Sequence, residues 1–462
     1  MKLDAKTAYA TMPPWRLFFT LALPGMVSMF AMSIYSIIEG VFIGQKLGEA
    51  AFAAVNIAFP IIMINFSLSD LIGVGAAVPI SIALGRKDEK AANNFFTCSV
   101  ILIFCTSLLM GAVMFFAAEP LARLMGADDS LAETAGRYIQ TYALCSPIST
   151  IFFAMDNYLR ISGYVKMSMF INIFFNGATL SFLALFLLVF EMDVVGSALA
   201  SCIAMCLCSL IALIPFVRRK ALLKFVRPRL SLGMIRQIAA CGSPAFFSNI
   251  AGRVTSILMN VSLMTLGVRV LGIGGGTTAV AAYSVLMYAS EMCQPLLYGM
   301  SDSLSPALGF NWGARNPERV KKIAGCSYIG SAVVSILAAA GMFLLADPLA
   351  ALFVDKQDAA LLALSSDALR LFSATYLLRW FSIATQGFLS AIEKPVHATI
   401  LSTSVALVFP VLMLGGLWNL GLSGIWLNMF GTSFLALLLG IVLLLHVFAD
   451  LRGNKEPRAD NE

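Results

Sequence analysis

The chain alternates long apolar runs with short polar segments. Twelve apolar runs can be read along the sequence, and each is longer than the roughly 20 residues that a helix needs to cross a bilayer. They cover residues 15–44, 52–84, 94–118, 137–160, 166–190, 194–217, 240–266, 278–310, 322–345, 366–391, 396–417 and 421–448. A transmembrane β-barrel would instead show short segments of alternating polarity. The pattern therefore predicts an all-α polytopic membrane protein with twelve transmembrane helices.

Composition supports this prediction. The chain has 462 residues, of which 59% are hydrophobic and 12% charged, and its mean hydropathy is +0.87. Soluble proteins average roughly 25% charged residues, so there is too little polar side chain here to cover a soluble surface. The net charge of +6 could indicate a nucleic-acid partner. We expect none, because the basic residues fall in the short loops between apolar runs, where membrane topology explains them.

The basic residues also predict an orientation. If the N-terminus is cytoplasmic, 23 of the 31 Lys and Arg residues fall in cytoplasmic segments and five in outer loops. Cytoplasmic loops of membrane proteins carry an excess of positive charge. The sequence therefore predicts that both termini are cytoplasmic.

An internal repeat divides the chain. Residues 119–122 (EPLA) recur as residues 347–350 (DPLA), 228 positions later, and Gly85 faces Gly313 at the same offset. This predicts two homologous six-helix lobes with the same orientation, since each has an even number of spans. The predicted parts are an N-terminal lobe 1–217, a basic cytoplasmic linker 218–236, a C-terminal lobe 237–450 and a polar cytoplasmic tail 451–462. Duplicated halves around a central cavity are typical of transporters rather than receptors or channels, although duplication can also be plain history.

Glu39 is the one ionisable side chain in the apolar run 17–43. A carboxyl group at membrane depth is costly unless it faces water, a cation or a partner, so it is a functional candidate by default. The alternative is that Glu39 lies near the helix end and reaches the headgroups.

Glu291 and Asp302 form a second acidic feature, in the run 278–310. Eleven residues separate them, which is three helical turns, so we expect them on one face about 16 Å apart. Such a stripe suits a cation or a cationic substrate. The alternative is structural pairing with Arg253 or Arg379, which also lie within predicted helices.

Other polar residues at depth are weaker candidates. Asp156 and Arg160 are four residues apart, so we expect a local ion pair. Asp70 is a further carboxyl in the second run. The nine cysteines lie in or beside apolar runs without a CxxC pair, so buried thiols are expected rather than a metal site.

The order and spacing of short motifs along nearly the whole chain resemble the multidrug and toxic compound extrusion (MATE) family. In the first half the resemblance is carried by Pro24, residues 39–44 (EGVFIG), Pro60, residues 73–75 (GVG), Leu159-Arg160 and residues 172–176 (NIFFN). In the second half it is carried by Gly299, Pro306, residues 309–314 (GFNWGA), Pro410 and residues 421–425 (GLSGI).

The resemblance implies a V-shaped pair of lobes that exports organic, often cationic compounds against inward Na⁺ or H⁺. In that family an acid on the first helix carries the ion, with an Asn and an Asp four apart on the fifth helix and a hydroxyl on the sixth. The matching positions are Glu39, Asn172, Asn176 and Ser201. Glu39 replaces an Asp and Asn176 replaces the second acid, so this site has one formal charge. The alternative for the two Asn residues is hydrogen bonding between helices, and the sequence leaves open whether Glu39 meets their face.

We therefore expect a cation-coupled antiporter, using Na⁺ or H⁺, that works by alternating access. Glu39 and Asp302 are the candidate Na⁺ ligands, and no other cofactor is expected. The expected partners are a small organic substrate and membrane lipids, for a monomer in the cytoplasmic (inner) membrane of a bacterium. The alternatives are a flippase for a lipid-linked precursor and a dedicated exporter of one natural product. Nothing indicates an enzyme, and no Walker motif points to ATP as the energy source.

Overall fold

The computed structural model describes the backbone at residues 4–354 and 358–453, and the side chains there except at 41, 43–45, 48–50, 52 and 450–453. Every regular element in these residues is a helix. The elements are α1 (Ala5–Thr11), α2 (Pro14–Gly85), α3 (Glu89–Phe116), α4 (Ala118–Leu124), α5 (Asp129–Ser149), α6 (Ile151–Ile161), α7 (Val165–Ala184), η1 (Leu185–Val189), α8 (Val194–Val217), α9 (Leu232–Leu271), α10 (Gly275–Gly313), α11 (Pro317–Leu344), α12 (Ala346–Ala350), α13 (Ala359–Ser373), α14 (Thr375–Ala391), α15 (Pro395–Thr403), η2 (Ser404–Val408), α16 (Phe409–Gly416), η3 (Trp418–Leu420) and α17 (Leu422–Gly453). Most of the predicted tail, residues 454–462, lies outside the described residues.

The helices follow the predicted apolar runs. Within the described chain, nine helical segments are long and apolar enough to cross a membrane, and ten if the bent pair α13 and α14 forms one span. The two other runs, 137–160 and 278–310, are helical as α5 with α6 and as α10, but they are more polar. The polarity of α10 includes Glu291 and Asp302. The chain is thus an all-helical, multi-pass membrane protein, and the count of twelve spans remains a prediction.

Packing divides the chain into two compact units. The first unit contains Met1–Phe246, Tyr298–Cys326 and Ser390–Glu393, and the second contains Phe247–Leu297, Ser327–Leu389 and Lys394–Glu462. The predicted lobes were defined by the sequence repeat and not by contacts, so their boundaries remain a prediction. Helices α9, α10 and α11 each contribute residues to both units.

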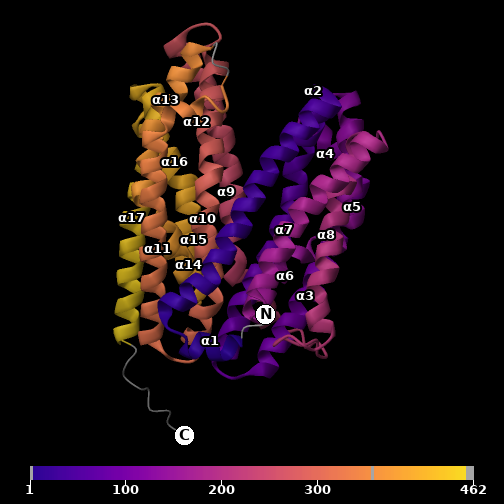
Figure 1. Cartoon of the computed structure of the whole chain (residues 1–462), viewed down its shortest axis with the longest axis vertical. Helices are drawn as coiled ribbons and strands as arrows, with labels where there is room; N and C mark the ends of the chain where they lie inside the picture. Colours follow the sequence, from indigo (N-terminus) through magenta and orange to yellow (C-terminus); the bar gives the residue numbers. More distant parts are fainter. Residues whose placement is uncertain (1–3, 355–357, 454–462) are drawn as a thin grey trace. The chain divides into compact units, whose positions relative to one another are not determined.

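The first unit is built around α2, along which α3, α5, α6 and α7 pack (Figure 1). Aromatic rings fill part of its interior. The ring of Phe96 in α3 lies 5.3 Å from that of Tyr158 in α6, 4.9 Å from Phe216 in α8 and 4.8 Å from Phe225 in the linker, between centroids. Buried aromatic side chains contribute large apolar areas, so this cluster joins three helices and the linker.

Polar side chains of α3 hold the linker predicted at 218–236. The backbone N–H of Lys224 donates to Asn93 Oδ1 at 2.8 Å. The side chain of Asn94 exchanges two hydrogen bonds with the backbone of Arg229, at 2.9 and 3.1 Å. The basic linker is therefore packed along α3, in the first unit.

Within the first unit, the end of α2 crosses the end of α10 at backbone contact. A Cβ atom at Gly85 would lie 2.0 Å from the carbonyl oxygen of Phe310, and one at Gly313 would lie 2.1 Å from that of Ile82. The two contacts are reciprocal, because Gly85 with Gly313 and Ile82 with Phe310 are both 228 positions apart. Small residues allow membrane helices to approach this closely. The sequence repeat is thus reflected in a local two-fold symmetry, which relates the end of α2 to the end of α10.

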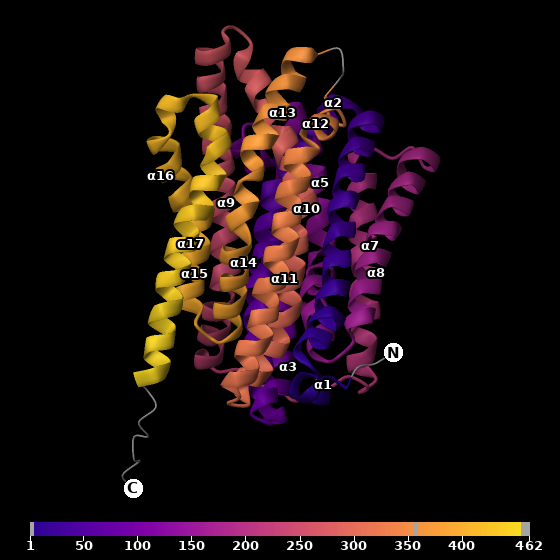
Figure 2. The same ribbon diagram turned by 60° about the vertical axis from the view of Figure 1, so that its left-hand side comes forward.

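Hydroxyl groups link helices of the second unit, in which α15, α16 and α17 lie side by side (Figure 2). The hydroxyls of Ser290 and Tyr376 are 3.0 Å apart, joining α10 to α14. Those of Tyr328 and Thr385 are 2.8 Å apart, joining α11 to α14. Such bonds are a common link between membrane helices.

Candidate ion-coupling site

Glu39, in the first apolar part of α2, faces the hydroxyl of a residue in α8. Ser201 Oγ donates a hydrogen bond to Glu39 Oε1 at 3.1 Å. Ser201 is buried, whereas Glu39 is half-buried. The hydroxyl of Tyr35, one turn before Glu39, lies beside this carboxylate. Of the four positions that the family resemblance implies, Glu39 and Ser201 therefore meet, and Tyr35 lies beside them.

Aromatic side chains surround this carboxylate. The ring of Tyr35 lies 5.7 Å from that of Phe175 in α7. Tyr138 and Tyr142 of α5 lie in the neighbourhood of Glu39, and their own rings are 5.3 Å apart. These tyrosines were not expected from the sequence. The sequence signal that could have identified Tyr35 is its position four residues before Glu39, which places the two side chains on one face of a helix.

Asn172 and Asn176 both lie on α7, but their side-chain amides have different surroundings. Asn172 Nδ2 donates to Asp156 Oδ1 at 2.8 Å and to the Ser168 carbonyl at 3.0 Å, so its amide bonds to α6 and to its own helix. Asn176 is buried, and neither polar atom of its amide has a hydrogen-bond partner among the described residues. It follows Phe175, whose ring lies beside Tyr35.

The expected ion pair between Asp156 and Arg160 is present, with Arg160 Nη2 at 2.6 Å from Asp156 Oδ2. The guanidinium also donates from Nε to Ser168 Oγ and from Nη1 to Ser303 Oγ, both at 3.1 Å. Its side chain is only 3% exposed. The sequence predicted the local pair, but it gave no signal for the bond that reaches Ser303 in α10.

Asp302 belongs to the first unit and has charged neighbours that the sequence did not pair with it. It interacts electrostatically with Asp70 of α2 and with both members of the Asp156–Arg160 pair. Its side chain is exposed. Arg253 and Arg379, the alternative partners expected from the sequence, belong to the second unit.

Glu291 lies on the same helix as Asp302 but belongs to the second unit. Its side chain is exposed. It interacts electrostatically with Arg253 of α9 and lies in the neighbourhood of Tyr376 of α14. The sequence suggested pairing with Arg253 as one structural alternative for Glu291, and Arg253 is indeed its neighbour.

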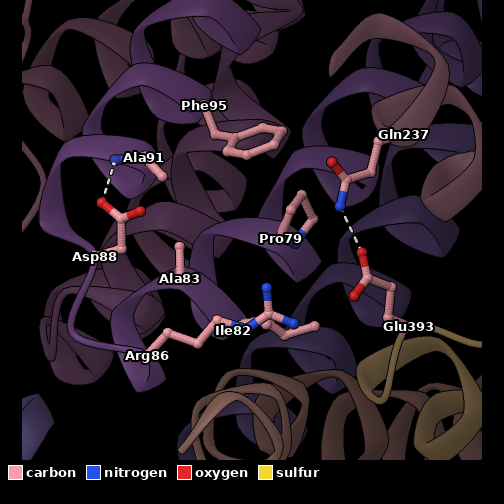
Figure 3. Close-up of a pocket in the computed structure, with 9 residues that line it drawn as sticks. All are labelled: Pro79, Ile82, Ala83, Arg86, Asp88, Ala91, Phe95, Gln237 and Glu393. Carbon is pink, nitrogen blue, oxygen red and sulfur yellow. Dashed lines mark hydrogen bonds between the residues drawn. The ribbon is translucent and has the colours of Figure 1, made fainter. Parts of the chain in front are cut away.

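A cavity of about 150 Å³ lies at the end of α2 in the first unit (Figure 3). Its polar lining includes Arg86, Asp88 and, from the turn after α14, Glu393. Gln237 of α9 points toward Glu393 and donates a hydrogen bond to its carboxylate (Figure 3). None of the site residues expected from the sequence lines this cavity.

Comparison with known proteins identifies the family. The sequence profile of the MatE family matches residues 24–185 and again residues 253–414. This chain belongs to the MATE family of transporters. The two matches begin 229 residues apart (253 − 24), which agrees with the repeat read from the sequence.

Relatives and solved structures agree along nearly the whole length of this MATE-family chain. The multidrug export protein MepA of Staphylococcus aureus (strain NCTC 8325 / PS 47) is 24% identical over 440 residues, covering 94% of each chain. MepA of Staphylococcus saprophyticus (strain ATCC 15305) is 25% identical over 413 residues, covering 87% of each. A crystal structure of MATE in the straight conformation matches with a TM-score of 0.89 at 22% identity, covering 97% of this chain and 99% of that one.

The chain thus has the MATE fold, and the resemblance seen in the sequence is confirmed. Membership of a transporter family also agrees with the expectation that the protein is not an enzyme.

Proposed function

We propose that this MATE-family protein is a cation-coupled antiporter that exports small organic compounds, including cationic ones, by alternating access. Inward movement of Na⁺ or H⁺ supplies the energy. Relatives named as multidrug export proteins, similar over 94% of the chain, support the export of varied organic compounds. The protein acts as a monomer, with the predicted lobes 1–217 and 237–450 as its moving parts.

The observation that carries this proposal is the hydrogen bond from Ser201 to Glu39. A hard cation such as Na⁺ prefers oxygen ligands. Glu39 supplies the charge, and the hydroxyls of Ser201 and Tyr35 supply neutral oxygens. A proton on the Glu39 carboxyl would satisfy the same site, because one carboxylate can hold either a proton or a cation. Exchange requires that this group be occupied on one side of the membrane and emptied on the other.

Asn176 and Asp302 extend this proposal. The buried amide of Asn176 has no partner among the described residues, so its oxygen is available to a cation that reaches this helix. Asp302 with Asp70 is a second candidate ion site, since the two carboxylates interact with each other. Glu291, which interacts with Arg253, is the weaker member of the predicted acidic pair.

The experiment that tests the function uses purified protein in vesicles, loaded with tetraphenylphosphonium as an organic cation. Na⁺ and proton gradients are imposed separately, with the membrane potential clamped. We expect one of the two gradients to drive movement of the probe against its own gradient. If neither gradient drives it, and the same holds for neutral organic probes, cation coupling is wrong.

We also propose that both termini are cytoplasmic, in the cytoplasmic membrane of a bacterium. Arg319 Nε, near the start of α11, donates a hydrogen bond to the carbonyl of Tyr9 at 2.7 Å. This contact supports placing the N-terminus and the start of α11 on the same side of the membrane. Reporter fusions after Arg227 and Arg319 should read cytoplasmic, and one after Asp358 should read external. A single inverted fusion would contradict this topology.

A further inference from the structure

The guanidinium of Arg160 lies where three helices of the first unit meet. It pairs with Asp156 in its own helix α6 at 2.6 Å and donates to Ser168 of α7 and Ser303 of α10 at 3.1 Å each. Its side chain is 3% exposed, and Ser168 and Ser303 are buried. Hydrogen bonds shielded from water in this way are stronger than exposed ones, so the network is sensitive to the loss of any member.

The backbone of Arg160 reaches α10 by a second route. Its carbonyl accepts a hydrogen bond of 2.7 Å from the hydroxyl of Tyr9 in α1. The carbonyl of Tyr9 in turn accepts from Asn311 Nδ2 at 3.0 Å. Arg160 therefore holds α10 directly at Ser303 and, through Tyr9, at Asn311. These two positions are eight residues apart, or about two helical turns.

The other end of the network is Asn172, which lies one helical turn before the proposed coupling residue Asn176 on α7. Asn172 Nδ2 and the hydroxyl of Ser168 both donate to Asp156 Oδ1, while Asp156 Oδ2 pairs with Arg160. Asn172 and Ser168 thereby both hold the carboxylate that pairs with the guanidinium. Because a guanidinium is a rigid planar fork, any turn of it moves all of its donors together. A continuous path of polar contacts runs from Asn172 to Ser303.

We propose that Arg160 is a positioning residue that transmits the state of the first-half ion site to the C-terminal half of α10, residues 298–313. This role rests on the proposed function, because it requires an ion or proton to act on α7. Occupancy of the site displaces the Asn172 amide from Asp156, the carboxylate and guanidinium turn, and the bond to Ser303 breaks. The C-terminal half of α10 is then released from α6.

Two mild variants separate this role from simple support of the fold. Ser303→Ala removes the hydroxyl that Arg160 reaches in α10 and leaves the pair with Asp156 in place. Arg160→Lys keeps the charge but lacks the fork that serves Ser168 and Ser303 together. Ser209→Ala, on α8, is the matched control, since Ser209 is equally buried and its hydroxyl has no hydrogen-bond partner among the described residues.

The test compares the full-length native protein with these variants in vesicles containing tetraphenylphosphonium. Exchange of labelled for unlabelled probe at zero ion gradient measures movement alone, and accumulation under the ion gradient measures coupling. We expect Ser303→Ala and Arg160→Lys to keep exchange within about twofold and to lose about tenfold in accumulation. Hydrogen–deuterium exchange in residues 298–313 should respond to the coupling ion in the native protein and in Ser209→Ala, but not in Ser303→Ala.

The outcomes distinguish the two proposals. If the native protein accumulates the probe and Ser303→Ala does so equally well, the role of Arg160 is wrong and the proposed function stands. If exchange, accumulation and thermal stability all fall together in both variants, Arg160 only supports the fold. If neither ion gradient drives accumulation by the native protein, the proposed function fails and the role of Arg160 fails with it.

Discussion

Ser201 Oγ donates a 3.1 Å hydrogen bond to Glu39 Oε1 across 162 positions of the sequence. The bond joins α8 to the first apolar part of α2 and places a hydroxyl against the one carboxylate of that run. Tyr35 adds a second hydroxyl from one turn earlier. The proposed site therefore combines a single negative charge with neutral oxygens.

Replacing Glu39 with Gln should abolish gradient-driven transport, because the amide has nearly the same shape but cannot carry a proton or a negative charge. Binding of tetraphenylphosphonium to the purified protein should largely survive. Glu39→Asp, which keeps the charge on a shorter arm, should retain transport. The control is Glu133→Gln, which changes an exposed carboxylate on α5 and should have no effect. Normal pumping by Glu39→Gln would show that the coupling site lies elsewhere, and Asp302 and Asp70 would be the next candidates.

Replacing Ser201 with Ala should weaken ion use without abolishing it. A hydrogen bond to a charged group contributes about 1.5–3 kcal/mol, so the ion concentration for half-maximal transport should rise by about tenfold or more. Ser209→Ala on the same helix removes a buried hydroxyl without a partner among the described residues. Titration of transport against Na⁺ and against pH measures the shift. Identical curves for the two variants would show that the bond to Glu39 has no part in ion binding.

Asp302→Asn tests the second candidate ion site. Among the residues that the structure describes, Asp302 shares its surroundings with Asp70, Asp156 and the guanidinium of Arg160. Because carboxylates outnumber cations there, neutralising Asp302 should leave thermal stability unchanged and weaken ion-coupled efflux several-fold. The control is Asp129→Asn, in an exposed ion pair of a kind that contributes little to stability. If Asp302→Asn instead unfolds the protein, Asp302 compensates the charge of Arg160 and is a structural residue.

Gly85→Ala and Gly313→Ala should each destabilise the protein, since the added methyl group would lie 2.0 or 2.1 Å from a backbone carbonyl oxygen. Overpacking costs about 1–3 kcal/mol, which outweighs the gain of up to about 1 kcal/mol in helix propensity. The double variant should lose less than the sum, because one separation of the helices relieves both clashes.

Thermal unfolding in detergent measures these losses. Gly177→Ala provides the control, because a Cβ atom there would meet nothing within 4 Å and the variant should be neutral or slightly stabilising. Equal melting temperatures for all three single variants would contradict the tight crossing.

Much of the fold could be predicted from the sequence because hydrophobic runs and repeats are local signals. The helices follow the apolar runs, and the family profile recurs at nearly the offset that residues 119–122 and 347–350 gave. The pair of Asp156 and Arg160 could also be predicted, since it depends only on helical spacing.

The contacts between distant helices could not be predicted in this way. Hydropathy does not specify which face of α7 meets α6, so the bond of Asn172 to Asp156 had no sequence signal. The resemblance placed Asn172 with Glu39, but the structure places it with Asp156. Similarly, the spacing of Glu291 and Asp302 predicted one stripe, whereas packing assigns the two residues to different units.

The reciprocal crossing of α2 and α10 restricts how these helices can move. Each helix presents a residue without a side chain to a carbonyl group of the other, at Gly85 and Gly313. A slide of one helical turn along α2 would bring Ser81, four positions before Gly85 and on the same helix face, against the carbonyl of Phe310, and the backbones would have to part. A change in the angle between the helices keeps both contacts. The crossing therefore opposes translation and permits rotation, as expected of the isologous interface of a symmetric dimer, here contained within one polypeptide.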